Sequence, residues 1–297
     1  MISRSHIESR ASRSFRVPAA AGRLLAHPLF ILLGALASLG LAGCAGPTAA
    51  PGESDARSEL ASEMALLAMD REALFTIAPA DDGTRLKALS TGFWQSKLDT
   101  AAPSDDAVRE LERRRRALDL LDSRELDFGV MSFATVFDGQ RHVEAYVVHV
   151  ATMDDVLARH PTFFAPFALT PGTSVGEVLA TVERMPRLDR FRAYGLLFGY
   201  PQYAVDFFVE AAGDEVPAGE PGATRPIVPR DFISIPVYES EANRFVWAAP
   251  KGHAGHPDDD RTRERARAIL AHYRSLRGEP PTDGILLLRK VQKTPTR

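Results

Sequence analysis

The sequence predicts an α+β fold with an antiparallel sheet. Two pairs of β-rich segments, 127–137 with 142–150 and 232–238 with 244–249, are each joined by a short connection, as in hairpins. A helical pattern punctuated by prolines covers 152–212 between them. Strands in hairpins with the helices grouped between them are typical of α+β proteins rather than of alternating βαβ units. We expect an antiparallel sheet built from the two hairpins plus a C-terminal strand, with a helical middle segment and flanking helices.

Two helices are expected before the first hairpin. Residues 58–74 carry apolar side chains at near-helical spacing, and PADDGT at 79–84 is typical of a turn. The second helix begins at Ser104, where Asp105 and Asp106 suit the positive N-terminal end of a helix. The apolar face of this helix consists of Val108, Leu111, Leu118 and Leu121.

Four consecutive arginines, 113–116, lie on this second helix. They have two interpretations, either a basic patch for lipid headgroups or nucleic acid, or solvated side chains paired with acids. Glu110 and Glu112 precede Arg114 and Arg116 by four residues, which is the spacing of ion pairs on one helix face. We therefore favour a solvated, paired face.

The remaining elements follow from turn residues and periodicity. Asp138-Gly139 between two β-rich segments is a strong hairpin signal, and Pro236 suggests an edge position for its strand. A Pro/Gly/acid-rich loop is expected at 213–229 and a charged helix at 258–277. We read DGILLLRKV, 283–291, as the last strand. Helices in the middle segment are expected at 153–159, 174–184, 187–198 and 201–212.

The N-terminal segment has the order of residues found in signal peptides. Five arginines lie within the first 23 residues, and Leu29 to Gly43 then contain no charge. Fifteen residues in a helix cover about 22 Å, which is short of the roughly 30 Å hydrocarbon core of a bilayer. The length favours a cleaved signal over the alternative of a retained membrane helix.

Leu41-Ala42-Gly43-Cys44 resembles the lipobox of bacterial lipoproteins. The resemblance covers residues 1–44 only and implies cleavage between Gly43 and Cys44, with diacylglycerol and a fatty acid such as palmitate attached to Cys44. Lipid chains of this kind hold a protein firmly at a membrane. Ala45 resembles the outer-membrane sorting signal of well-studied diderm bacteria, which would place the protein at the outer membrane, facing the periplasm. The alternative is a chance apolar stretch that ends in a buried cysteine.

The resemblance, together with the composition of the remaining residues, divides the chain into four parts. These are a signal peptide at 1–43, a flexible Pro/Gly/Ser-rich tether at 44–56, a single α+β domain at 57–293 and a short tail at 294–297. The domain itself resembles no family that we identify. Cys44 is the only cysteine, so the chain forms no intramolecular disulfide, and lipidation would leave it no thiol for catalysis or metal binding.

The charge balance argues against a nucleic-acid partner. Of 36 basic and 39 acidic residues, five arginines and one glutamate precede Cys44, which leaves 31 basic and 38 acidic residues in the rest. Phosphate binding needs clustered positive charge, whereas this remainder is mildly acidic. The partners we expect are the membrane, through the lipid anchor, and a protein of the cell envelope.

The best metal candidate is KGHAGHPDDD, in which His253 and His256 precede Asp258. Imidazole and carboxylate side chains bind zinc or a similar divalent ion when a loop brings them together. The alternative is a solvated loop whose aspartates stabilise the start of the following helix, and we favour it. We predict no cofactor, and a divalent metal is the option that this segment leaves open.

Other candidate residues lie in the first hairpin and after it. His142 and Glu144 would share one strand face as an acid/base pair, or simply form a polar outer face. His149, seven residues from His142, belongs on the opposite face as a core histidine. The PTFFAPF segment places Phe163, Phe164 and Phe167 in a Pro-bounded loop, where they would either contact a lipid or protein partner or pack inside.

The sequence contains no nucleotide-binding, serine-hydrolase or zinc-protease signature. We therefore expect a lipid-anchored binding or scaffolding module rather than an enzyme. The alternative is an envelope hydrolase that uses His/carboxylate chemistry, with or without a divalent metal. A third hypothesis is carriage of a small molecule or lipid in a pocket lined by the aromatic helices within 187–212.

Overall fold

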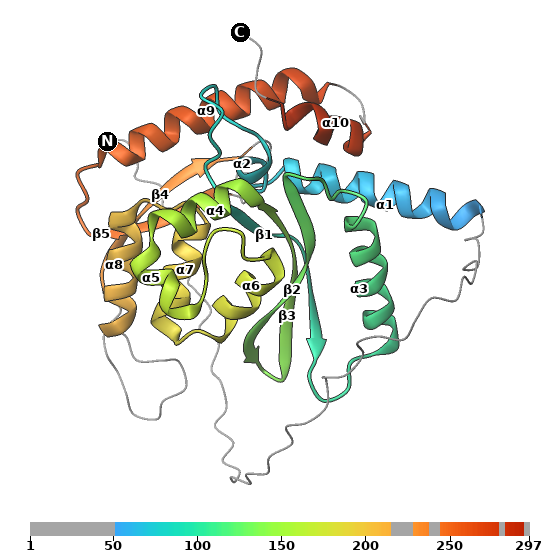
Figure 1. The fold of residues 1–297 in the computed structure, drawn as a ribbon, viewed down its shortest axis with the longest axis horizontal. Helices are drawn as coiled ribbons and strands as arrows, with labels where there is room; N and C mark the ends of the chain where they lie inside the picture. The colour runs from blue at the N-terminus through green and yellow to red at the C-terminus, as the bar shows by residue number, and fades with distance from the viewer. Residues whose placement is uncertain (1–50, 215–227, 238–243, 279–282, 294–297) are drawn as a thin grey trace, which may run out of the picture. The chain divides into compact units, whose positions relative to one another are not determined.

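The two strands joined by the Asp138-Gly139 turn belong to a three-stranded sheet with the order β1-β3-β2 (Figure 1). The computed structural model describes residues 51–214, 228–237, 244–278 and 283–293. Strand β3 (Gln140–His149) pairs antiparallel with β2 (Leu126–Phe137) on one side and with β1 (Leu89–Asp99) on the other. The α+β prediction, with antiparallel strands and flanking helices, is confirmed.

Several predicted features lie outside the described residues. These are the signal peptide with Gly43 and Cys44, most of the 213–229 loop, the turn of the second hairpin and the tail at 294–297. Of the tether predicted at 44–56, the last six residues belong to helix α1 (Pro51–Met69). The described residues belong to one compact unit.

Strand β1 was not predicted from the sequence. Its residues, LSTGFWQSKLD, alternate poorly between apolar and polar side chains. The structure explains the irregularity, because the register of β1 against β3 shifts between Thr91 and Gln95. Four residues of β1 span two residues of β3 there, and Gly92 has a positive φ, so the period-2 pattern is interrupted inside the strand.

The second hairpin is confirmed, but it does not extend the first sheet. Strands β4 (Arg230–Pro236) and β5 (Arg244–Pro250) pair antiparallel with each other as a separate two-stranded sheet. The expectation that both hairpins build one sheet was therefore wrong in this respect. Pro236 lies at the last position of β4, opposite Arg244, where its missing N–H interrupts no continuing strand.

The predicted last strand at 283–291 is wrong, because these residues form helix α10 (Gly284–Val291). The side chain of Asp283 accepts hydrogen bonds from the backbone N–H groups of Ile285 and Leu286 and thereby caps the helix. A continuous apolar run does not distinguish a buried strand from a buried helix. The buried residues, Gly284, Leu287, Leu288 and Val291, recur at helical spacing.

Helices cover both faces of the three-stranded sheet (Figure 1). Ala145 and Val147 of β3 belong to a core shared with α1 and with α3 (Asp105–Leu118), whose cap is Ser104 as predicted. Val148 belongs to a second core, shared with the middle helices. The middle helices are α4 (Val150–Arg159), α5 (Pro161–Phe164), a short 3-10 turn (Ala165–Phe167), α6 (Val175–Arg184), α7 (Arg187–Leu197) and α8 (Gln202–Asp214).

Two further helices complete the described chain. Helix α2 (Leu74–Ile77) follows α1, so the helix predicted at 58–74 is divided at residues 70–73. Helix α9 (Pro257–Arg277) agrees closely with the prediction for 258–277. Within the described residues, no helix combines the length and apolar character needed to cross a membrane.

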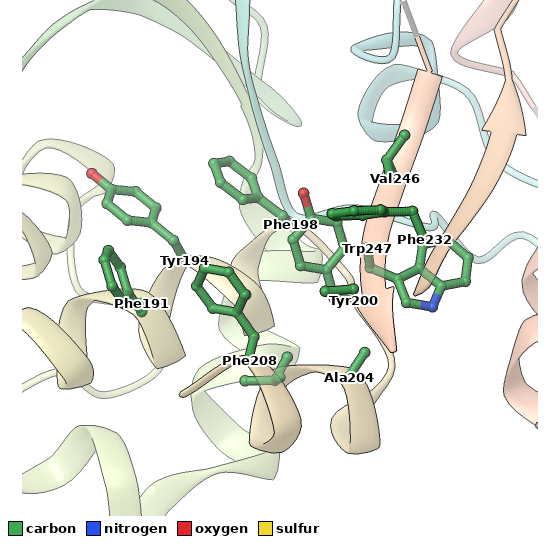
Figure 2. A pocket seen from close by; sticks show the side chains of 12 residues that line it. Phe191, Tyr194, Phe198, Tyr200, Ala204, Phe208, Phe232, Val246 and Trp247 are labelled. Carbon is green, nitrogen blue, oxygen red and sulfur yellow. The ribbon is translucent and has the colours of Figure 1, made fainter. Parts of the chain in front are cut away.

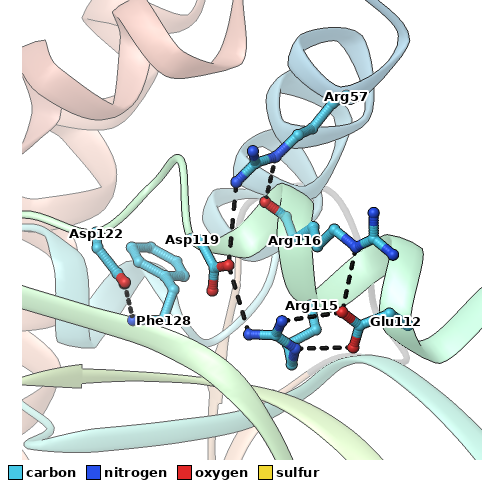
Figure 3. A network of polar contacts seen from close by, with 7 residues as sticks. All are labelled: Arg57, Glu112, Arg115, Arg116, Asp119, Asp122 and Phe128. Carbon is cyan, nitrogen blue, oxygen red and sulfur yellow. Dashed lines mark hydrogen bonds and ion pairs between the residues drawn. The ribbon is translucent and has the colours of Figure 1, made fainter. Parts of the chain in front are cut away.

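The four arginines of α3 are paired with acids, as we favoured, and Figure 3 shows the contacts of Arg115 and Arg116. Glu112 binds both Arg115 at 2.9 Å and Arg116 at 3.1 Å, and these contacts hold the pKa of Glu112 near 2. Arg114 differs from its neighbours, because its side chain is only 14% exposed and its guanidinium lies 5.5 Å from the Trp94 ring centroid. It therefore contributes packing as well as charge.

Gly284 permits the close contact between α10 and α1. A Cβ atom at this position would lie 2.0 Å from the backbone carbonyl oxygen of Ser62. We expect Gly284→Ala to lower the free energy of unfolding by about 1–3 kcal/mol, since the two helices must move apart. Gly176→Ala is the matched control, because Gly176 also lies in a first helical turn and has no atom within 4 Å of the added carbon. Urea denaturation that shows equal stability for the two variants would contradict this account.

Candidate functional site

The most distinct site is an apolar pocket of about 330 Å³ between helices α7 and α8 and the β4–β5 hairpin (Figure 2). Aromatic rings from all of these elements form most of its wall, and none of the twelve lining residues is charged. Pockets that bind small molecules have volumes of this order and are lined mainly by apolar and aromatic side chains. The lining consists of Phe191, Tyr194, Gly195, Phe198, Tyr200, Ala204, Val205, Phe208, Phe232, Val246, Trp247 and Ala248.

Prolines in the sequence mark where the two helices of this wall begin. Helix α7 follows Pro186 and ends at Leu197, and α8 begins directly after Pro201. The two helices pack against each other, with the ring of Phe191 on α7 5.5 Å from that of Phe208 on α8. The predicted aromatic helices therefore exist, and they line a cavity on one side.

The polar atom of Trp247 is bound outside the pocket. Its indole N–H donates to the hydroxyl of Tyr203 at 3.1 Å, and that hydroxyl donates to Asp259 at 2.5 Å. Asp259 is fully buried and also contacts His253 Nε2 at 2.8 Å. Burial alone would raise the pKa of Asp259, but the hydrogen bonds from Tyr203, His253 and the His256 backbone lower it. The chain of contacts fixes the Trp247 ring as a wall.

The hydroxyl of Tyr194 is also bound away from the cavity. It donates to the carboxylate of Glu183 on α6, whose other oxygen accepts the Ala134 backbone N–H at 2.5 Å. Figure 2 shows this hydroxyl directed away from the other labelled rings. Burial and the neighbouring Glu183 raise the pKa of Tyr194 well above its usual range. Tyr194 therefore presents its ring, and not its oxygen, to the pocket.

A buried lysine lies behind the aromatic wall. The Lys87 ammonium is 3.1 Å from Glu72, 5.2 Å from the Phe198 ring centroid and 4.9 Å from that of Phe245. Burial lowers the pKa of Lys87, and the ion pair with Glu72 opposes this effect. The ammonium is partnered by a carboxylate and by two aromatic faces, which favour a cation.

His253, His256 and Asp258 serve the start of α9 in this structure. Nδ1 of His256 accepts the backbone N–H of Asp258 at 3.2 Å, and Asp259 accepts the His256 N–H at 3.1 Å. The segment caps the helix, as in the interpretation that we favoured, but Asp259 is buried and not solvated. Across the described ranges, no group of three or more His, Cys, Asp or Glu side chains has an arrangement that could hold a metal ion.

His142 and Glu144 lie on the same face of β3, as predicted, but neither lines the apolar pocket. Burial raises the pKa of Glu144, and a hydrogen bond with Thr91 and the charge of His142 act in the opposite direction. The two residues therefore interact electrostatically. The structure does not bring them together with His253 or His256, which lie at the start of α9.

The phenylalanines of the PTFFAPF segment form short helical turns instead of an open loop. Phe164 is fully buried, and Phe163 packs against it with ring centroids 4.8 Å apart. Phe167 is half-buried and lies 6.0 Å from Phe163. All three contribute to the second core, so this geometry favours packing over an exposed aromatic loop.

A second cavity of about 900 Å³ is more polar and is lined by α4 and the starts of α8 and α9. Four arginines line it, and most are already paired. Arg85 contacts Glu125 at 3.6 Å and Arg265 contacts Asp82 at 2.9 Å, while Arg261 contacts Asp258. Because acidic side chains pair with most of these arginines, the lining of this cavity favours neither an anionic nor a cationic ligand.

Comparison with known proteins returned no match of the chain to any family model, curated protein or solved structure. The pocket is therefore interpreted from its own geometry. Sequence reasoning missed its hairpin wall, made of Phe232, Val246, Trp247 and Ala248. The available signal was an aromatic residue on each strand of a two-stranded hairpin, which must cover its apolar side chains against other elements.

His149 lies where β3 meets α4, and it is a core histidine with a satisfied hydrogen bond, as predicted. It is 6% exposed, and its Nδ1 accepts the backbone N–H of Thr152 at 3.1 Å. Burial, with a smaller contribution from the charge of Arg85, lowers the pKa of His149 to about 4 from an ordinary value of 6.5. Only an unprotonated nitrogen accepts this hydrogen bond.

This cap makes stability depend on pH. Because the unfolded chain binds the proton more tightly, stability is complete above about pH 6.5 and falls as pH decreases toward 4, by up to about 3 kcal/mol. We expect His149→Asn, which keeps an acceptor without a titrating ring, to reduce this dependence. His149→Ala should lack the cap at every pH and lose about 1 kcal/mol at pH 7. Denaturation at pH 4.5 and 7 tests this, and an undiminished pH dependence in His149→Asn would contradict it.

Proposed function

We propose that this protein binds a small apolar molecule in the pocket between α7, α8 and the β4–β5 hairpin. The observation that supports the proposal is a cavity of about 330 Å³ whose lining is almost entirely aromatic and aliphatic. Burial of apolar ligand surface against such a wall contributes about 25 cal/mol per Å² before the costs of association. This proposal develops the carriage hypothesis and specifies the binding module that the sequence suggested.

The geometry favours binding over hydrolysis at this site. The lining contains no carboxylate, imidazole or thiol, which are the commonest groups in general acid/base and nucleophilic catalysis, and the Tyr194 hydroxyl is bound to Glu183. His142 and Glu144 line neither of the two cavities described above. A hydrolase would need these side chains to reach a bound substrate.

Phe232 tests the pocket directly, because it lies on β4 at the cavity wall and is 65% exposed. We expect Phe232→Ala to weaken binding of a neutral fluorescent probe such as N-phenyl-1-naphthylamine several-fold to about tenfold, through loss of one aromatic contact. Folding stability should change little, since the ring is already exposed.

The matched control is Phe137→Ala. Phe137 is 76% exposed at the end of β2 and does not line the pocket, so its loss should leave probe affinity unchanged. Fluorescence titration of the two purified variants compares them under identical conditions. Equal affinities for both variants would contradict the proposed location, and absence of probe binding in the wild type would contradict the proposed function.

We further propose that the protein is a lipid-anchored component of the bacterial cell envelope. Support comes from the resemblance of Leu41-Ala42-Gly43-Cys44 to a lipobox, after a charged and then an apolar segment. The domain would then work at a membrane surface and, in a diderm, at the outer membrane facing the periplasm. An apolar ligand of low solubility suits that location, because membranes concentrate such molecules.

Metabolic labelling tests the anchor. Cells that express the full chain and are grown with a radioactive fatty acid should incorporate label into the wild type, whereas Cys44→Ala should take up none. The thiol is the attachment point, so no other residue should substitute for it. Label in both proteins, or in neither, would refute the anchor and leave the pocket proposal standing.

A further inference from the structure

Helix α10 carries cations and one leucine on the side that faces away from the core. Its buried residues recur at helical spacing from Gly284 to Val291. At 3.6 residues per turn, four exposed residues fall on the opposite side, within an arc of about 100°. They are Leu286, Arg289, Lys290 and Lys293, and we call them the basic face of α10. The N–H of Lys293 donates to the carbonyl of Lys290 at 3.2 Å, which continues the helical turn to that residue.

The three cations of this face lack an acidic partner among the described residues. None of their side chains forms an ion pair or a hydrogen bond with that part of the chain. The arginines of α3 differ, because Glu110 and Glu112 neutralise much of their charge. Leu286 lies among the cations of α10 and is 51% exposed. The basic face therefore presents uncompensated positive charge together with apolar surface.

A purely structural role explains only part of this face. Arg289 and Lys290 lie in the last turn of α10, where cations stabilise the helix dipole. The dipole does not explain an exposed leucine on the same side. It also does not explain Arg267, which is exposed in the middle of α9 and forms no ion pair within the described ranges. Figure 1 shows α9 and α10 together along one side of the molecule, so these charges belong to one surface.

The proposed anchor allows this surface to reach a membrane. Cys44 and Pro51, the first residue of α1, are seven positions apart, and an extended chain of that length spans about 24 Å. Helix α10 packs on α1, where the N–H of Gly284 donates to the hydroxyl of Ser62 at 2.7 Å. Ser62 lies about 16 Å along α1 from its first residue. An acylated Cys44 would therefore keep α10 within reach of the bilayer.

The charge of α1 favours the same orientation. Glu53, Asp55 and Glu59 are exposed at its start, and an anionic lipid surface repels them while it attracts the cations of α10. Each Lys or Arg near such a surface strengthens the attraction about fivefold. The distribution of charge therefore favours contact through α10 rather than through the start of α1.

We propose that the basic face of α10 is a docking surface for an anionic phospholipid bilayer, with Leu286 at the interface and the three cations against the headgroups. This proposal rests on the proposed lipid anchor, which brings the domain to the membrane. The anchor attaches the protein, and the basic face determines which side of the domain lies on the bilayer.

A single fluorescent label at position 286 tests the proposal in the lipidated protein. Cys44 is the only cysteine and would be acylated, so the thiol of Leu286→Cys is the one that reacts with an NBD maleimide. The labelled protein is reconstituted on vesicles that contain a nitroxide-headgroup lipid in phosphatidylcholine, with or without phosphatidylglycerol. We expect stronger quenching on the vesicles with phosphatidylglycerol, because the label then lies at the headgroups. High salt should remove this difference by screening the charges.

The matched control for the label is Phe137→Cys. Phe137 is also apolar and is 76% exposed at the end of β2. The β2–β3 turn that follows it lies at the opposite end of the molecule from α10 (Figure 1). Its label should be quenched weakly on both kinds of vesicle.

Two charge variants, each combined with the label at position 286, separate local charge from net charge. Lys290→Gln/Lys293→Gln should lower the equilibrium constant for docking on the anionic vesicles about 25-fold. Arg109→Gln/Arg113→Gln removes the same charge from exposed ion pairs of α3 and should leave docking unchanged. Circular dichroism and melting temperature establish that both variants fold.

The outcomes distinguish the docking surface from the anchor. If the protein floats with neither kind of vesicle, the anchor fails and the docking proposal fails with it. If the protein floats but the label at 286 is quenched no more than the label at 137, or equally on both kinds of vesicle, the anchor stands and the docking surface is refuted, which leaves an acidic protein as the partner of this face. Equal loss of quenching in the two charge variants would also refute it.

Discussion

The arrangement around the pocket depends on one fully buried carboxylate, Asp259 at the start of α9. A buried charge without hydrogen bonds would cost several kcal/mol, so the chain must bring donors to it. Those donors come from Tyr203 on α8 and from His253 and His256 in the segment before α9. Because Tyr203 also accepts the Trp247 N–H from β5, the need to satisfy Asp259 holds one helix, one hairpin and one helix start together.

Much of the fold could be predicted where the residues that determine an element lie close together in the sequence. The Asp138-Gly139 turn, the cap at Ser104 and the acid partners of the α3 arginines each depend on residues within a few positions, and all three are present. The prediction failed where distant contacts decide. Strand β1 gains its order from pairing with β3, and the final apolar run packs as a helix against Ser62 of α1, some 220 residues away.

The candidate site shows the same division. Helical periodicity and the positions of the prolines identified the aromatic helices. Periodicity does not show whether an aromatic face packs against a hairpin or lines a cavity. Phe232 and Trp247 are some 30 to 60 residues from Phe191 and Phe198, so only the folded chain places these side chains on one wall. Likewise, the sequence around His253 and Asp259 is compatible both with a metal site and with a helix cap. The choice depends on Tyr203, which is about 50 residues away.

The Lys87–Glu72 pair has a consequence for how this chain can vary. The ammonium is almost completely enclosed and lies on Phe198 and Phe245, while its carboxylate partner belongs to the segment between α1 and α2. Removal of either charge alone would leave the other uncompensated, whereas joint replacement by apolar residues of similar volume is tolerated in many proteins. A substitution of Glu72 alone would leave the enclosed ammonium without its carboxylate, so a change at position 72 is tolerated best when position 87 also becomes apolar.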